Sequence, residues 1–324
     1  MAESRLPPSI RDRIEELKLR RYFPERRRAI RLRRSELTRI KEPGYLDFKL
    51  ATEREELEAA WRLLHDVYVE QGYMRPHPSG LRLIVHNLLP QTTVFIARRR
   101  QAVRNGGEVI GTITLFVDSP LGLPMDEVFH EELEGLRRQG RRISEVGALA
   151  LKREHRNRNV FMYLFKIAHA YARYLGMHDL CIAIHPKHRS FYEEVLLFEP
   201  FGHQVRPYGK VNGSPAVAER LDLTTAEQRA RQVYEPLEFD ANLHAFFYAA
   251  EQGYPFATEE RRKVLTPELL RYFFVERTDL LPRLDERTLE VVRRCYPGYD
   301  FGAILNGHRG FGGPAPRCAG SPSG

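Results

Sequence analysis

The sequence predicts a mixed α/β fold in which a mostly antiparallel sheet is flanked by helices. Apolar runs of strand length recur between residues 92 and 223, and some of them follow one another with only a turn between. Other stretches repeat apolar residues at three- and four-residue steps, as one face of a helix does. The 324 residues, 42% of them hydrophobic, can form one substantial core with appendages or two small domains.

The first half of the expected core begins with a helix and continues with a pair of strands. In chain order we expect a capped helix after residues 52–56, paired strands over 92–97 and 109–117, and a helix over 125–138. Asn105-Gly106-Gly107 predicts the hairpin turn between the strands. We expect Trp61 and Tyr68 of the first helix to pack in the core.

Residues 144–202 are the most informative segment. Small residues such as Gly147 interrupt the apolar run 146–151, which indicates a strand with a bulge or a closely approaching ligand. A helix over 160–175 should end at Gly176. A buried strand follows over 180–184, and Ser190 is placed to cap a short helix. Residues 217–223 alternate like a final strand.

The link between strand and helix is a basic turn, residues 152–159. A helix N-terminus presents unpaired N–H groups and the positive end of the helix dipole, so it attracts phosphate. Arg156 and Arg158 would add positive charge at this point. A solvated basic turn is the alternative interpretation, and spacing alone does not decide between the two.

Five blocks of sequence occur in one order between residues 45 and 224. They are Ser79–Arg82, Asp118–Asp126, Glu145–Leu151, Asp179–His188 and Phe191–Gly202. Together they resemble the FeeM-type long-chain N-acyl amino acid synthases. The resemblance implies a GNAT-like core, similar to that of autoinducer synthases. It also implies transfer of a fatty acyl group from acyl carrier protein to the amine of an amino acid.

The basic turn differs from the corresponding turn of CoA-dependent GNAT enzymes, which usually contains glycines. This chain has Arg156-Asn157-Arg158-Asn159 instead. Two arginines suffice for the single phosphodiester of a carrier-bound phosphopantetheine, whereas a pyrophosphate favours a glycine cradle. We therefore expect acyl-phosphopantetheine of acyl carrier protein as the donor, no tightly bound cofactor and no metal.

We expect catalytic roles for three residues, of which the resemblance implies those of Glu145 and Tyr192, while the position of His185 at the end of its strand suggests the third. Glu145 would orient or deprotonate the amine, Tyr192 would protonate the leaving thiolate, and His185 would shuttle a proton. Each has an alternative. Glu145 can form an ion pair with Arg141 or Arg142, Tyr192 can fill the core, and a lone histidine is commonly a surface residue.

Binding residues are expected at both ends of the same site. Those implied for the phosphopantetheine donor are Ala148, Leu149, Leu151, Arg156, Arg158 and Asn159. Backbone N–H groups around Ala148 would hold the oxyanion, and the donor arm can pair with the strand edge. Those implied for the acceptor or the acyl chain are Tyr73, Met74 and His188.

Positive charge is concentrated near the N-terminus. Residues 11–41 contain 13 Lys and Arg against 5 Asp and Glu, and this net charge of +8 equals that of the whole chain. The arginines concerned are Arg26, Arg27, Arg28, Arg31, Arg33 and Arg34. Such an arm should meet an acidic partner, either a carrier protein or an anionic membrane surface. Nucleic acid is disfavoured because no recognition motif accompanies the charge, and a solvated arm is the alternative.

These features predict four parts of the chain. They are a basic arm over residues 1–43, the acyltransferase core over 44–224, a helical C-terminal extension over 225–306 and a disordered tail over 307–324. Dense aromatics in the extension should cover an edge of the core or form a lid over the acyl chain. Three distant cysteines, with no signal-peptide or membrane-span pattern, predict a cytoplasmic protein, peripheral at the inner membrane if the arm binds lipid.

Two other functions remain open. An autoinducer-type synthase would use S-adenosylmethionine, but Ala148 stands where that family has an arginine, three residues after the strand glutamate. A non-catalytic protein could instead sense an acyl ligand while its basic arm contacts membrane or nucleic acid. The presence of Glu145, Tyr192 and the arginine pair argues against that alternative.

Overall fold

The computed structural model describes residues 45–100, 107–156, 159–202, 204–237, 242–248 and 265–306, with Arg28, Leu32 and Phe256. It divides into two compact units, Met1–Val264 and Leu265–Gly324. The first unit therefore continues beyond residue 224, where we expected the core to end. The reason is that Tyr234 and Phe247, which follow that point, are buried in the core of the first unit.

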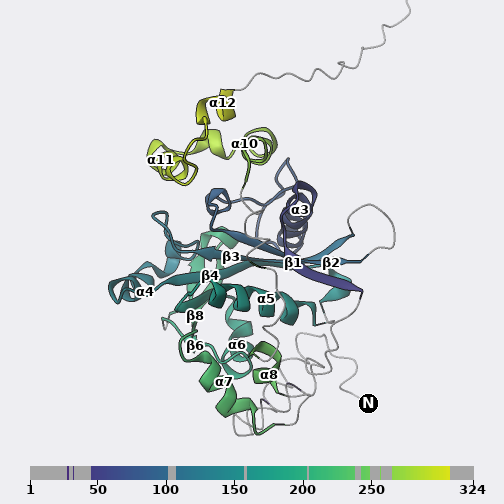
Figure 1. Cartoon of the computed structure of the whole chain (residues 1–324), viewed down its shortest axis with the longest axis vertical. Helices are drawn as coiled ribbons and strands as arrows, with labels where there is room; N and C mark the ends of the chain where they lie inside the picture. Colours follow the sequence, from purple (N-terminus) through teal and green to yellow (C-terminus); the bar gives the residue numbers. More distant parts are fainter. Residues whose placement is uncertain are drawn as a thin grey trace, which may run out of the picture. The chain divides into compact units, whose positions relative to one another are not determined.

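The first unit is built on an eight-stranded sheet (Figure 1). Its strands are β1 (Leu46–Leu50), β2 (Thr93–Arg99), β3 (Val109–Val117), β4 (Ile143–Leu151), β5 (Asp179–Ile184), β6 (Glu199–Pro200), β7 (Arg206–Tyr208) and β8 (Ser214–Asp222). The order is β1-β2-β3-β4-β5-β8-β6, and β7 also pairs with β8. Among the described strands only β4 and β5 run parallel to each other. The predicted fold class, a mostly antiparallel sheet flanked by helices, is confirmed.

Helices cover both faces of the sheet, with α3 on one face and α5 on the other (Figure 1). The helices of this unit are α3 (Arg54–Glu70), η2 (Val85–Leu88), α4 (Asp126–Arg138), η3 (Arg153–His155), α5 (Val160–Tyr174), η4 (Pro186–His188), α6 (Arg189–Glu194), η5 (Gly209–Val211), α7 (Ala226–Tyr234) and α8 (Leu243–Tyr248). α3 begins where the capping sequence predicts, because Glu56 Oε2 accepts hydrogen bonds from the N–H groups of Thr52 (3.1 Å) and Glu53 (3.4 Å). The expected Ser190 cap is wrong, since α6 already begins at Arg189.

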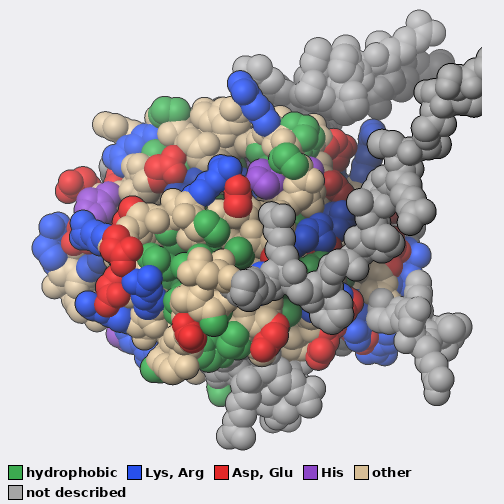
Figure 2. All heavy atoms as spheres, turned by 90° about the horizontal axis from the view of Figure 1, so that it is seen from above, with side chains coloured by type: hydrophobic (Ala, Val, Ile, Leu, Met, Phe, Trp, Pro, Cys, Tyr) green, Lys and Arg blue, Asp and Glu red, His purple; other side chains and the backbone are tan. Residues whose placement is uncertain are grey.

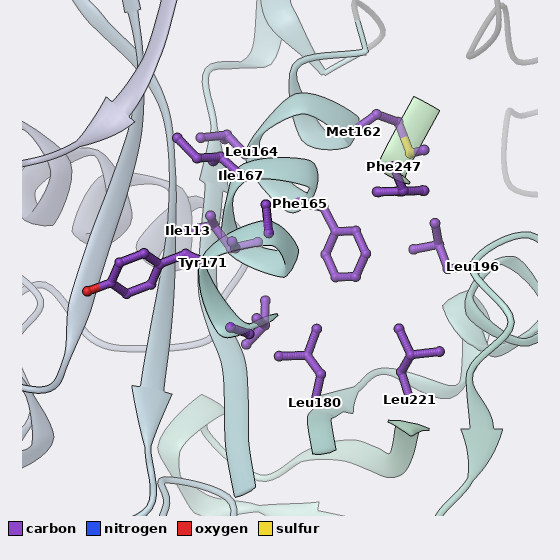
Figure 3. Close-up of a cluster of buried hydrophobic side chains, with 14 of the residues drawn as sticks. Ile113, Met162, Leu164, Phe165, Ile167, Tyr171, Leu180, Leu196, Leu221 and Phe247 are labelled. Carbon is purple, nitrogen blue, oxygen red and sulfur yellow. The ribbon is translucent and has the colours of Figure 1, made fainter. Parts of the chain in front are cut away.

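The main core surrounds α5, whose residues are almost all buried. Figure 3 shows Phe165 and Ile167 of this helix among side chains of β3, β5, β8 and α8. Full burial of a side chain of this size contributes about 1.5–3 kcal/mol. The helix stops before Gly176, whose φ of +69° suits a residue without a Cβ. α5 is thus fixed along its length by the core.

A second apolar cluster lies under α4. Phe129 and Leu133 of this helix pack with Phe116 of β3 and Cys181 of β5. Burial of Cys181 raises the pKa of its thiol well above the ordinary value, in agreement with the buried strand predicted over 180–184. This cluster anchors the loop 118–125, which leads into α4.

Two residues of the basic arm are described, and both contact the rest of the first unit. Leu32 is fully buried in the main core, and Arg28 Nε donates a hydrogen bond to the carbonyl of Glu194 at 2.6 Å. Arg26, Arg27, Arg31, Arg33 and Arg34 lie outside the described residues. On the face drawn in Figure 2, basic and acidic side chains are interspersed. No helix in the described ranges combines the length and apolarity needed to cross a bilayer.

The second unit is helical over its described residues, 265–306. It contains α10 (Pro267–Arg271), η7 (Tyr272–Arg277), η8 (Leu281–Arg283), α11 (Glu286–Arg294) and α12 (Phe301–Asn306). Thr266 Oγ1 accepts a hydrogen bond from the N–H of Leu269 at 3.3 Å and caps α10. Phe273, Phe274 and Val292 form its interior. The helical character predicted for this segment is present, although Tyr272–Arg277 is a π-helix. The predicted tail over 307–324 lies outside the described residues.

Candidate active site

The site lies where the two parallel strands separate. β4 and β5 pair at three positions only, the last of which joins Glu145 to Cys181. Beyond this position β5 remains paired with β8 as far as Ile184, while β4 remains paired with β3. Residues 146–151 of β4 and 182–184 of β5 line one cavity of about 440 Å³. The opening between the strands therefore forms one wall of the cavity.

The predicted bulge is present in β4. Thr112 of β3 pairs with Ala150 and Thr114 pairs with Gly147, so Ala148 and Leu149 together stand opposite Ile113. Ala148 has a φ of +48°, which an alanine adopts only under constraint from its surroundings. Ala148, Leu149 and Leu151 all line the cavity. A bulge interrupts the hydrogen-bond ladder and can turn backbone N–H groups toward a ligand.

Glu145 is buried at the closed end of the opening, with 3% of its surface exposed. Its Oε2 accepts a hydrogen bond from the N–H of Met125 at 2.8 Å. Burial raises the pKa of this carboxyl to about 8, because desolvation outweighs that hydrogen bond and the positive charge of Lys210. The side chain lines the cavity, so a carboxyl group with a strongly raised proton affinity faces the space where a ligand would lie.

The alternative role of Glu145 as an ion-pair partner is wrong for Arg141. The Arg141 guanidinium pairs with Asp179 and with Asp222 instead. Among the described residues Arg142 forms no ion pair with Glu145 either, and its backbone N–H donates to His178. Glu145 therefore faces the cavity without an ion pair to Arg141 or Arg142, the two basic residues near it in sequence.

The loop that presents Met125 is fixed by Arg137 of α4. Its Nη2 donates to Asp118 Oδ1 at 2.8 Å and to Asp126 Oδ2 at 2.6 Å. Asp126 Oδ2 also accepts the N–H of Leu123 at 2.6 Å. Both ends of the Pro/Gly-rich loop are thereby tied to one helix, and the Met125 N–H is held in place for Glu145.

Tyr192 also lines the cavity, on the side of α6. Its ring lies between those of Phe161, Phe191 and Phe198, at centroid distances of 6.2, 5.6 and 5.5 Å. Burial raises the pKa of the phenol, so it is protonated at neutral pH. The side chain thus packs in an aromatic cluster, as the alternative interpretation expected, and borders the cavity as a proton donor must.

His185 and His188 flank the end of β5, and both line the cavity. The Nδ1 of His185 accepts a hydrogen bond from the Lys187 N–H at 3.1 Å. Desolvation and the positive charge of Lys187 lower the pKa of each imidazole. Both rings are therefore neutral near pH 7 and can accept a proton.

The basic turn lies at the other end of β4. Arg156 lines the cavity, but its Nη2 pairs with Glu70 Oε2 of α3 at 2.9 Å. Asn159 has a φ of +58° and directly precedes α5. Asn157 and Arg158 lie outside the described residues. One of the two predicted arginines is thus placed beside the cavity, with an acidic neighbour that the sequence did not indicate.

The acceptor side contains residues that sequence reasoning missed. Tyr73, expected to contact the acceptor or the acyl chain, lines the cavity, whereas Met74 is not a lining residue and its sulfur lies 3.9 Å from Arg82 Nη1. The lining residues not predicted for the site include Tyr68, Arg82, Tyr208 and Lys210. Tyr68 was expected in the core, but only Trp61 is buried there. Arg82 belongs to a block that carried the family resemblance, and this was the available signal.

No cluster of three or more His, Cys, Asp or Glu side chains suited to a metal ion occurs among the residues that the structure describes.

Comparisons with known proteins point to one family. The family model "N-acyl amino acid synthase FeeM" matches residues 59–222, half of the chain. The chain is similar to the structure of FeeM, an N-acyl amino acid synthase from uncultured soil microbes, with 27% identity and a TM-score of 0.50. The match covers 60% of this chain and 98% of that one. No curated protein shows significant sequence similarity to the chain.

More distant structural similarities exist as well. The acyl-homoserine-lactone synthase LasI has 13% identity and a TM-score of 0.42, over 56% of this chain and 92% of that one. A putative N-acetyltransferase from Lactobacillus plantarum has 16% identity and a TM-score of 0.38, over 56% and 99%. Scores this low support no inference about the site. The match to the family model spans half of the chain, including β4, its bulge and both charged ends of the cavity. The chain therefore belongs to the FeeM family of N-acyl amino acid synthases and is an N-acyltransferase.

Proposed function

We propose that this chain transfers a long-chain fatty acyl group from acyl carrier protein to the amine of an amino acid. The observation that supports this most is that Glu145 and Arg156 line the same cavity, connected by the bulged edge of β4. A carboxyl group suited to proton transfer thus lies at one end, and a cation suited to a phosphate lies at the other.

The edge of β4 suits an extended donor arm. Pantetheine carries two amide groups, which can pair with backbone groups of residues 146–151 as an added strand would. Six residues of strand span about 20 Å, which separates the phosphate end from Glu145. At the far end Arg156 would form a charge-assisted hydrogen bond with the single phosphodiester, after leaving Glu70.

The proposed chemistry is direct transfer. Glu145, in its ionised form, takes a proton from the acceptor ammonium, and the resulting amine attacks the carbonyl carbon of the thioester. Backbone N–H groups around Ala148 would stabilise the oxyanion of the tetrahedral intermediate. When the C–S bond breaks, the phenol of Tyr192 gives its proton to the thiolate, and the tyrosinate regains a proton from the nitrogen of the intermediate. The one proton left on Glu145 would pass to solvent through His185 or His188, both neutral at pH 7.

A direct test uses purified protein with lauroyl-, myristoyl- and palmitoyl-carrier protein, the matching CoA thioesters and a mixture of the twenty common amino acids. Mass spectrometry of the extracted products should show fatty acyl amino acids formed from the carrier-protein donors at low concentration. Equal use of CoA donors would contradict the carrier-protein assignment. With S-adenosylmethionine added, a lactone product would favour an autoinducer synthase, and absence of any acylated amine would contradict the proposed function.

We also propose that the basic segment 11–41 recruits the carrier protein, which is acidic, or an anionic membrane surface in the cytoplasm. Association through exposed charges weakens with salt. The apparent KM for acyl-carrier protein should therefore rise between 50 and 300 mM NaCl, and replacing Arg26, Arg27, Arg33 and Arg34 by Gln should reduce that rise. A salt-independent KM would exclude this role.

A further inference from the structure

We propose that Arg82 binds the carboxylate of the acceptor, so that the acceptor must be an amino acid with a free carboxyl group rather than a simple amine. This inference rests on the proposed function and adds a specificity-determining residue to it. It is carried by the contacts of the Arg82 guanidinium, which is half-buried and lines the cavity.

The Arg82 side chain is held in place from two sides. Its Nη2 donates a hydrogen bond to the carbonyl of Lys210 at 2.6 Å, and its guanidinium lies over the ring of Tyr68 at 4.7 Å. Its Nη1 has the sulfur of Met74 at 3.9 Å, and a thioether is a weak acceptor. The guanidinium is thus oriented by neutral groups and retains donor capacity toward the cavity.

The charge of Arg82 is not neutralised by any carboxylate of the described residues. Two other cations that line the cavity are neutralised in this way, since Arg156 pairs with Glu70 and Lys210 pairs with Glu127. A half-buried guanidinium that lacks a counter-charge, beside an empty space, is what an anionic ligand group requires. The two-pronged guanidinium of an arginine matches a planar carboxylate better than the ammonium group of a lysine does.

Arg82 lies at the Glu145 end of the cavity rather than at the phosphate end. Burial raises the pKa of Tyr68 and of Tyr208, and for both tyrosines the charge of Glu145 adds to this effect while that of Arg82 opposes it. Both charges therefore act on the same two phenols. Arg156 follows Leu151, about 20 Å along the strand from Glu145.

The two ends of an amino acid match this pair of charges. Its ammonium would face Glu145 and its carboxylate would face Arg82, so that the nitrogen lies beside the group that removes its proton. An amine without a carboxylate would leave the guanidinium without a partner. A charge-assisted bidentate contact of this kind contributes about 10- to 100-fold in affinity.

The test compares amino acids with their C-terminal carboxamides, which keep the amine and the side chain. For each of the twenty common amino acids and its amide, kcat/KM is measured in the wild type, in Arg82→Gln and in Arg62→Gln, a control on the exposed face of α3 whose partner is Glu58. The wild type and the control should favour the free acid by about 10- to 100-fold. Arg82→Gln should lose this preference through a raised KM for the acid, with the KM values for the amide and the donor unchanged.

Several results would overturn the inference. Equal use of acid and amide by the wild type would do so without any variant, even if Arg82→Gln failed to fold. A preference retained by Arg82→Gln would also do so, and a rise in donor KM instead would assign Arg82 to the donor. If no acyl transfer is detected, the proposed function fails, but calorimetric measurement of free amino acid binding still tests Arg82. Unchanged binding in Arg82→Gln would then overturn the role of Arg82.

Discussion

The backbone N–H of Met125 donates a hydrogen bond to Oε2 of Glu145, at 2.8 Å, from a loop that is distant in sequence. This single donor stabilises the ionised carboxylate, but burial outweighs it and the pKa remains raised, to about 8. Glu145 is therefore present in both protonation states at slightly alkaline pH. A general base needs this balance to remove a proton from an amine.

Replacing Glu145 by Gln should lower kcat about 10²- to 10⁴-fold, because the amide cannot accept the ammonium proton. The side chain keeps its shape and can still accept the Met125 N–H, so the KM for the donor should change little. Steady-state kinetics between pH 6 and 9.5 provide the measurement. In the wild type kcat/KM should rise with increasing pH, with an apparent pKa near 8. In Glu145→Gln this component should be absent, so that only the titration of the acceptor amine remains. A variant with the wild-type rate at every pH would exclude Glu145 as the base.

The same residue should make folding stability depend on pH. The folded-state pKa of Glu145, about 8, is above its ordinary value of 4.5, so the folded protein binds a proton that the unfolded chain has released. This contribution is complete below pH 4.5 and is lost as the pH rises through about 8, with a slope of up to about 1.4 kcal/mol per pH unit. Urea unfolding at pH 5.5, 6.5 and 7.5 should show Glu145→Gln gaining stability relative to the wild type at each step. Parallel profiles for the two proteins would show that Glu145 ionises normally.

Tyr192→Phe separates a proton donor from a core residue, since only the hydroxyl is removed. The ring contacts with Phe161, Phe191 and Phe198 are retained, so the melting temperature should change by less than about 2 °C. If the phenol protonates the thiolate, kcat should fall about 10- to 100-fold. Tyr234→Phe, which removes a buried hydroxyl that donates to the carbonyl of Val195, is the matched control and should affect stability more than kcat. Full activity of Tyr192→Phe would assign this side chain to packing alone.

Glu70 and Arg156 should have opposite effects on the donor. Their ion pair is partly exposed and contributes no more than about 1 kcal/mol to stability, so both single variants should fold. Glu70→Gln releases the guanidinium and should lower the KM for acyl-carrier protein about two- to five-fold. Arg156→Gln should raise that KM about ten-fold or more while leaving the acceptor KM unchanged. The phosphate role of Arg156 fails if the acceptor and donor KM values rise together.

Elements that depend on local sequence were predicted well. The strand pair β2–β3, the helices α3, α4 and α5 and the stop at Gly176 follow from apolar periodicity and from turn or capping residues, which act within a few positions of themselves. Gly147 indicated the bulge of β4 because glycine in a strand marks irregular pairing.

The prediction located the cavity along β4 and at the end of β5, together with Tyr73, Arg156 and Tyr192, but it missed residues on the acceptor side. Arg82 lies between α3 and η2, Tyr208 ends β7 and Lys210 lies in η5, and nothing in their spacing connects them to Glu145. The pairing of Arg156 with a residue 86 positions earlier is likewise a product of the tertiary fold. Arg141 was a plausible partner for Glu145 by proximity in sequence, but the parallel register places Asp179 beside it instead.

The burial of Leu32 has a practical consequence for anyone who shortens this protein. A chain that begins after residue 43 would lose the arginines of the basic arm together with the fully buried Leu32. Removing a buried leucine side chain lowers the free energy of unfolding by about 2–5 kcal/mol. Reduced expression or activity of such a truncation would then reflect a hole in the interior rather than missing charge. Charge-neutral replacement at full length, with the aliphatic anchor retained, is the cleaner way to learn what the arm does.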